Sequence, residues 1–253
     1  MLHFIYDHTF DGLLTCVFDA YYQKCFPDKI ASNEDKTLLF TDVYHVVTDD
    51  QKSNRVLTAL KKKISSHAIH MLFACYMSEL DGVEMLIFNY IKKTFASPKG
   101  IETNFADPDV LELSRIYKKV SKEAERMRQF VRFQKTADGI FFACIEPLYN
   151  VLPFAAEFFE DRFADQQWII YDVKRKYALY YDLNKTEEVF FDQLLIDTDT
   201  GKLSEEQSDK SEIDFQKLWK QYFKSITIKE RINLKLQRQH MPRRFWKYLP
   251  EKQ

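Results

Sequence analysis

The sequence predicts an α+β fold that is mainly helical and contains a small antiparallel sheet in the middle of the chain. Two observations support this fold class. In most of the N-terminal half, and again near the C-terminus, apolar residues recur at spacings of three and four, which indicates amphipathic helices. Between these regions, strand-like runs and one helix follow one another in the order β-β-α-β-β, and such hairpins favour antiparallel pairing.

The N-terminal half begins with a short predicted strand over 2–6, in which the side chains alternate, and a β-rich stretch follows at 37–47. The clearest helix starts at Asp107-Pro108, because an N-cap residue is followed there by proline at the first helical position. Four shorter helices are expected before it, over 9–24, 49–65, 67–80 and 82–95.

The middle of the chain contains two predicted hairpins separated by a helix over 151–163. The first hairpin turns at Asp138-Gly139, a pair of residues typical of tight turns. The four predicted strands are 129–134, 140–146, 167–172 and 176–182. Beyond them, 197–210 is polar and lacks periodicity, which favours an exposed loop.

The end of the chain is helical again, with predicted helices over 215–226, 228–239 and 242–248. We expect one domain over residues 1–253. Within it, 1–128 is mostly helical and 129–196 contains the sheet. The last part, 212–253, is basic and helical.

The chain has 253 residues but only five glycines, and no two of these lie within ten residues of each other. Phosphate-cradling loops such as G-x-G-x-x-G and G-x-x-x-x-G-K-[ST] need closely spaced glycines, so the standard nucleotide-binding loops are excluded. The four cysteines form no C-x-x-C pair and lie among apolar residues, which is typical of buried reduced thiols. We therefore expect no resident cofactor and no metal centre.

The N-terminus lacks the basic stretch and long apolar run of a secretion signal. The longest apolar run, 71–77, is too short to cross a bilayer. These features predict a cytoplasmic protein without a membrane partner.

A net charge of −1 hides a strong asymmetry along the chain. The last thirty residues contain nine lysines and arginines but only two glutamates, a local charge of +7, whereas the rest of the chain carries −8. A basic segment on an acidic body is typical of a docking surface for an anionic partner.

Basic and aromatic side chains alternate within this segment, and this combination suits single-stranded nucleic acid, where cations neutralise phosphates and rings stack on unpaired bases. The alternative is an amphipathic segment that packs its rings on the protein's own body. The candidate nucleic-acid-binding residues are Lys229, Arg231, Lys235, Arg238, Arg243, Arg244, Phe245 and Trp246.

No sequence signature identifies an active site, and three aspartates are the candidate catalytic residues: Asp7, Asp11 and Asp165. Asp7 and Asp11 lie at the junction of the first strand and the first helix, where carboxylates bind metals or transfer protons; helix capping is the alternative. Arg162 lies close in sequence to Asp161 and Asp165, and is a candidate phosphate or carboxylate ligand, or else part of a local ion network.

Four groups of motifs together resemble a bacterial family of uncharacterised DNA-metabolism proteins. They are YDHTFDGLL at 6–14 with VFDAY at 17–21; VRF at 131–133 through IEP at 145–147 and LP at 152–153; DRFAD at 161–165 with WIIYD at 168–172; and IKERIN at 228–233 through MPRRFWKYL at 241–249.

Members of that family are typically encoded beside a radical-SAM protein of DNA modification or repair, and some relatives are fused to a uracil-DNA glycosylase-like domain. The resemblance implies an accessory role in DNA repair or modification, with DNA and a radical-SAM protein as partners. It assigns no catalytic residue. Three hypotheses therefore remain open: a nucleic-acid-binding accessory protein, a nucleic-acid-processing enzyme that uses the three aspartates, and a protein-interaction module without DNA affinity.

Overall fold

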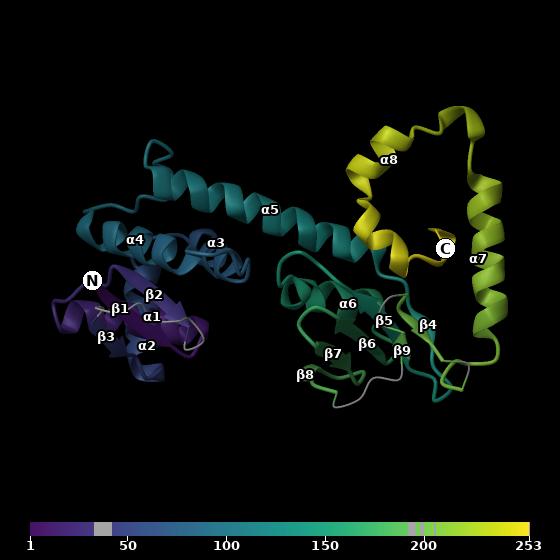
Figure 1. The fold of residues 1–253 in the computed structure, drawn as a ribbon, viewed down its shortest axis with the longest axis horizontal. Coiled ribbons are helices and arrows are strands. Elements are labelled where there is room, and N and C mark those ends of the chain that lie inside the picture. The colour runs from purple at the N-terminus through teal and green to yellow at the C-terminus, as the bar shows by residue number, and fades with distance from the viewer. Residues whose placement is uncertain (33–41, 192–195, 198–199, 205, 253) are drawn as a thin grey trace. The chain divides into compact units, whose positions relative to one another are not determined.

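The computed structural model describes residues 1–32, 42–191, 196–197, 200–204 and 206–252 (Figure 1). The chain divides into two compact units, Met1–Ser121 and Lys122–Gln253. Each unit has its own sheet and its own helices, and each is described separately below. Within the described residues, no helix is both long and apolar enough to cross a membrane.

The N-terminal unit contains a three-stranded parallel sheet in the order β2-β1-β3. Strand β1 (Leu2–Tyr6) pairs with β2 (Lys29–Ser32) on one side and with β3 (Asp42–His45) on the other. Helix α1 (Phe10–Tyr22) connects β1 to β2, as parallel pairing requires a crossover. The predicted strand at 2–6 is confirmed as β1, whereas β2 was not predicted. Strand β3 lies within the β-rich stretch at 37–47, of which residues 37–41 lie outside the described residues.

Four further helices complete this unit, and α5 extends past its boundary: α2 (Asp50–Lys61), α3 (Ser66–Tyr76), α4 (Val83–Ala96) and α5 (Pro108–Phe130). Side-chain caps begin four of the unit's helices, and at α5 Asp107 accepts hydrogen bonds from the Asp109 and Val110 amides. Thr9 accepts a hydrogen bond from the Gly12 amide, Asp49 from Gln51 and Lys52, and Ser65 from Ala68. These helices confirm the predicted ones within a few residues.

The C-terminal unit contains a five-stranded sheet in the order β4-β5-β6-β7-β8. The strands are β4 (Gln134–Lys135), β5 (Phe141–Ile145), β6 (Trp168–Asp172), β7 (Tyr177–Tyr181) and β8 (Thr186–Val189). Three of the four pairings are antiparallel, which agrees with the predicted α+β class. The β5–β6 pair is parallel, because the short 3-10 helix η1 (Leu152–Ala155) and helix α6 (Ala156–Arg162) cross over between them.

Two predicted elements of this unit differ in the structure. The strand expected at 129–134 is reduced to its last residue plus Lys135, because α5 continues to Phe130. Within the predicted loop at 197–210, the described residues include a short antiparallel pair, β9 (Ile196–Asp197) and β10 (Lys202–Leu203). Residues 198–199 and 205 lie outside the described residues.

The chain ends in α7 (Glu212–Ile226), η2 (Lys229–Arg231), α8 (Leu234–His240), η3 (Arg243–Tyr248) and η4 (Pro250–Lys252). The single helix predicted over 228–239 was wrong, since Ile232 is extended and the Asn233 side chain caps a new helix by accepting a bond from the Leu236 amide. The end of this region enters the core, where Phe245, Tyr248 and Leu249 are buried.

Candidate nucleic-acid interface

Four of the predicted nucleic-acid-binding cations lie on η2 and α8, which Figure 1 shows in yellow beyond the sheet of the same unit. Their side chains are exposed, and in the described part of the chain none of them forms an ion pair: Lys229, Arg231, Lys235 and Arg238. A cation that no protein carboxylate neutralises can pair with a phosphate and release the counterions condensed around it. These four side chains are therefore available to such a partner.

The next four predicted residues have different surroundings. Arg244 forms an ion pair with Glu123, and Phe245 is 7% exposed and packs on Phe130 with ring centroids 5.3 Å apart. Arg243 is exposed, and its guanidinium lies 5.9 Å from the Trp246 ring. Arg243 and Trp246 are accessible to a ligand, whereas Arg244 and Phe245 hold η3 against the body of the unit.

Glu123 explains why Arg244 is needed for the fold. Its side chain is 2% exposed, and its carboxylate accepts a hydrogen bond of 3.0 Å from the Leu148 amide. Arg126 contributes a second positive charge at 3.7 Å. A buried carboxylate is stable only when it is paired and hydrogen-bonded, so Arg244 compensates a charge that the fold has taken out of water.

The segment α7–η2–α8 also exposes many large apolar side chains, all at least 38% accessible: Ile213, Phe215, Leu218, Trp219, Tyr222, Ile226, Ile228, Ile232, Leu234 and Leu236. The amphipathic face predicted for 215–226 exists, but most of it faces solvent instead of a core. Large exposed apolar surfaces on a soluble protein mark interaction sites.

Both ends of this exposed segment are fastened to the rest of the unit. At its start, the Glu212 carboxylate accepts a 3.0 Å bond from the Lys135 amide. At its end, Arg126 donates to the Gln239 carbonyl at 3.2 Å. The terminal η4 adds Glu251, which accepts a 2.9 Å bond from the Trp219 indole and pairs with Arg132 at 2.8 Å.

Burial favours a raised pKa for Glu251, but the Trp219 hydrogen bond and the Arg132 charge outweigh it and hold the pKa below its usual value. The carboxylate is therefore ionised at neutral pH.

Beside this contact, a pocket of about 480 Å³ lies between α7 and the start of the sheet, with Phe133, Phe215 and Trp219 among its lining residues.

The three candidate catalytic aspartates belong to different units. Asp7 and Asp11 lie in the N-terminal unit, at the end of β1 and in the first turn of α1, whereas Asp165 is exposed in the turn after α6 of the other unit. Among the residues that the structure describes, no group of three histidine, cysteine, aspartate or glutamate side chains is placed to hold a metal.

Asp7 is engaged in a local hydrogen-bond network. One carboxylate oxygen accepts bonds from the Thr9 amide at 3.1 Å and the Thr9 hydroxyl at 2.8 Å, and the other accepts from the Thr48 hydroxyl at 2.8 Å. Desolvation opposes ionisation, but these bonds outweigh it and lower the pKa of Asp7. Gly12 permits the arrangement, since a Cβ there would collide with the Asp7 Oδ1 atom.

Arg162, the last residue of α6, is exposed, and its guanidinium lies 5.7 Å from the Phe163 ring. In the described structure it forms no ion pair with Asp161 or Asp165, so the local ion network considered for these residues is not present. The role of Arg162 as a phosphate or carboxylate ligand stays a prediction.

The cysteines are all free, and three of them are buried. Burial raises the pKa of the Cys16, Cys75 and Cys144 thiols to about 12, so these thiols stay protonated at neutral pH. The expectation of buried thiols was wrong for Cys25, which is exposed.

A second surface with cations and rings lies in the N-terminal unit, and the sequence did not indicate it as a site. It is formed by α1, α2 and α4, and includes Phe18, Arg55, Lys62 and Phe95. In the sequence, Phe18 follows the apolar period of a helix, and the lysines at 61–63 suit the negative C-terminal end of the helix before them. Only the packing of three helices brings these residues together.

Comparison with known proteins identifies the family of the chain but assigns no activity to it. No curated protein matches it. Among solved structures, a pGpG-specific phosphodiesterase, PggH from Vibrio cholerae, is similar over 89% of this chain and 98% of its own, at 11% identity and a TM-score of 0.32. That score is too low to support an inference about fold or function. Residues 81–251, two thirds of the chain, match DUF4130, a domain of unknown function. The protein therefore belongs to the DUF4130 family.

Proposed function

We propose that this protein is an accessory factor of DNA repair or modification that binds nucleic acid through its basic C-terminal segment. The observation that carries the proposal is the exposure of Lys229, Arg231, Lys235 and Arg238 without an ion pair among the described residues. The partner in this role is a radical-SAM protein, as the family resemblance implies, and that partner supplies its own iron–sulfur cluster.

The charge distribution supports this choice of surface. The last thirty residues carry +7 and the remainder of the chain −8, so the C-terminal segment is the part of the chain whose net charge attracts a polyanion. Each phosphate neutralised on single-stranded nucleic acid contributes a salt dependence of about −0.7 in log K against log salt. Four contacts therefore produce a slope of about −3 from these side chains.

Rings near the cations favour single strands over duplex. The charged groups of Arg243 and Lys252 lie 5.9 and 5.2 Å from the Trp246 ring. On α7, Phe215 and Tyr222 are more than half exposed. Aromatic rings stack on unpaired bases, and duplex DNA does not offer such bases.

The test is a salt titration of the full chain with a fluorescent single-stranded oligonucleotide, read by anisotropy, with a duplex of equal length beside it. Replacing the four cations with alanine is expected to weaken binding and to flatten the salt slope by about 3. The matched control replaces four exposed cations of α5, Arg115, Lys118, Lys119 and Lys122, and has the same change in net charge. Absence of binding at low salt, or an equal loss in the control, would refute the proposal.

A second candidate function, a protein-interaction module, is favoured by the exposed aliphatic side chains on α7 and α8. Leu218, Ile226 and Leu236 are 50–61% exposed, and such groups gain little from phosphates or bases but much from an apolar partner surface. Co-purification with the radical-SAM protein tests it. Leu218→Asp with Ile226→Asp should abolish a complex that the four-alanine variant retains, and a complex unaffected by the aspartates would contradict this role.

A further inference from the structure

Helices α1, α2 and α4 line an open groove on the N-terminal unit. It consists of two adjoining pockets of about 490 and 350 Å³, which share Arg55, Ala59 and Phe95 as lining residues. Volumes of this size suit one nucleotide each. Because the two pockets are continuous and open to solvent, they suit consecutive units of a chain better than one enclosed molecule.

Aromatic rings form much of the groove's surface. Phe18 and Tyr22 of α1 stack with ring centroids 6.0 Å apart and an interplanar angle of 15°. Tyr21 meets Phe95 of α4 edge-on at 5.8 Å. Tyr22 is 79% exposed, so one face of this stack is open to a further ring.

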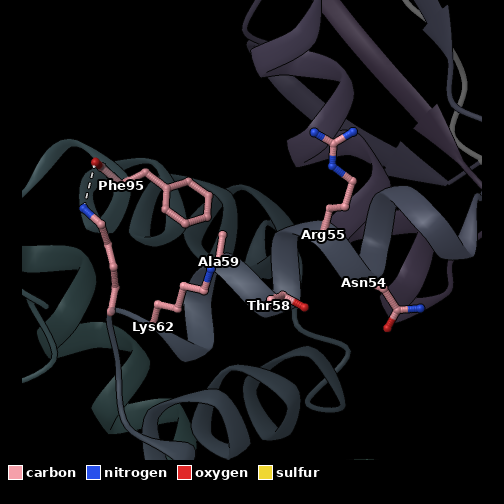
Figure 2. A pocket seen from close by; sticks show the side chains of 7 residues that line it. Asn54, Arg55, Thr58, Ala59, Lys62 and Phe95 are labelled. Atoms are coloured by element: carbon pink, nitrogen blue, oxygen red, sulfur yellow. Dashed lines mark hydrogen bonds between the residues drawn. The ribbon is translucent and has the colours of Figure 1, made fainter.

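The charged lining residues are all cations, beside the neutral polar Asn54 and Thr58, and none of these cations pairs with a carboxylate among the described residues. Arg55 and Lys62 are exposed, and among the described residues neither makes a hydrogen bond or an ion pair. The Arg55 guanidinium lies 5.0 Å from the Phe18 ring, which leaves its N–H donors free at the ring's edge. Figure 2 shows Arg55 directed toward α1, while the Lys62 and Phe95 side chains extend toward Ala59.

Lys63 has a different role, at the end of the groove. Its ammonium donates to the carbonyls of Thr94, Phe95 and Ser97 at 3.3, 3.1 and 2.6 Å, and one of these bonds is drawn in Figure 2. It thereby covers the negative C-terminal end of α4, which would otherwise repel an anion in the groove.

The lining contains no acidic residue, although the N-terminal unit as a whole has sixteen carboxylates and fourteen lysines and arginines. All of the charged lining residues are cations and four lining residues are aromatic, and in an acidic unit this combination favours a ligand that is both anionic and aromatic. We propose that this groove is a second nucleic-acid-binding surface, which stacks unpaired bases of a single strand on Tyr22 and Phe95 and holds the phosphates on Arg55 and Lys62.

This inference does not rest on the C-terminal surface, and the experiment separates the two. The background is the full chain that already has alanine at Lys229, Arg231, Lys235 and Arg238. A fluorescent oligothymidylate is titrated into it, and the same oligonucleotide with 5-bromouracil is photocrosslinked to map the contact. Binding should persist in this background, with crosslinks to peptides that contain residues 18–22 or 95.

Two sets of substitutions then test the assigned roles. Tyr22→Ala removes a ring that is mostly exposed, so the fold is preserved, and it should weaken binding about tenfold. Arg55→Ala with Lys62→Ala should flatten the salt slope by about 1.4, the value for two phosphate contacts. The matched control, Lys118→Ala with Lys119→Ala, removes the same charge from exposed positions of the same unit and should change neither quantity.

Other outcomes would overturn the inference. Crosslinks confined to the C-terminal unit, or groove variants that bind like their control, would exclude the groove as a contact surface. Equal affinity for duplex would contradict base stacking. Competition by thymidine monophosphate at the same concentration as the oligonucleotide would identify a free-nucleotide pocket instead of a single-strand site.

Discussion

Replacement of Arg244 by methionine should destabilise the C-terminal unit, because it leaves the Glu123 carboxylate buried with too little positive charge. Breaking a buried ion pair by removing one partner costs about 3–5 kcal/mol. Arg244 is 29% exposed, and Arg126 remains 3.7 Å from the carboxylate, so both facts reduce the loss. We expect the free energy of unfolding to fall by about 2–3 kcal/mol.

The assay uses the distribution of tryptophan. All three tryptophans, Trp168, Trp219 and Trp246, belong to the C-terminal unit, so fluorescence during urea unfolding reports on that unit alone. Arg243→Met is the matched control, since Arg243 is exposed and has no ion pair in the described structure; its effect should stay within about 0.5 kcal/mol.

A double variant separates the burial of charge from the loss of packing. Glu123→Gln keeps an acceptor for the Leu148 amide while it removes the charge that Arg244 neutralises. Combined with Arg244→Met, it should recover most of the lost stability. If Arg244→Met unfolds at the wild-type urea concentration, or if the double variant is no more stable than the single one, the reasoning about Glu123 is wrong.

Four further predictions follow from contacts described above. Gly201→Val should destabilise the C-terminal unit by about 2 kcal/mol in the same fluorescence assay, because φ is +69° and a Cβ would lie 2.7 Å from the Tyr248 ring; an unchanged midpoint would contradict this. Asp7→Asn should lower the free energy of unfolding at neutral pH but not at a pH well below 3.8, the ordinary carboxyl pKa. A lowered pKa stabilises the fold above that value, and this contribution is lost as the pH falls. Urea unfolding followed by circular dichroism at the two pH values measures the difference. Lys63→Met should cost about 1–3 kcal/mol in the circular dichroism assay, as three carbonyls lose their donor, and Lys62→Met is its exposed control. Native protein should react with a maleimide at Cys25 only, and mass spectrometry that finds labelled peptides from the three buried thiols would contradict their burial.

Much of the helical structure could be predicted because its signals are local. The caps at Thr9, Asp49 and Ser65 and the proline after Asp107 act within one turn of the chain, so the sequence itself indicates where these helices begin. The parallel pairing of β1 with β2 depends on a crossover between distant segments, and strand periodicity does not specify which neighbour a strand will take.

The candidate interfaces show the same limit. The apolar period of α7 predicts which side chains share a face, but not whether that face meets a core, and most of it is exposed. Between Arg243 and Trp246, adjacent residues differ in their contacts. Arg244 pairs with Glu123 and Phe245 packs on Phe130, whereas Arg243 is exposed. The groove of the N-terminal unit combines residues from three helices and therefore has no local motif.

The fastening of the segment between Glu212 and Gln239 at both ends has a thermodynamic consequence. A free tail that becomes ordered on a partner loses chain entropy along its whole length, which offsets part of the contact energy. Here the ends are already held, so the entropy of closing the loop is lost when the protein folds instead of when it binds. Loss of the Glu212–Lys135 and Arg126–Gln239 contacts should therefore weaken the affinity for a ligand that binds this segment, because the entropy of closing the loop would then be lost on binding.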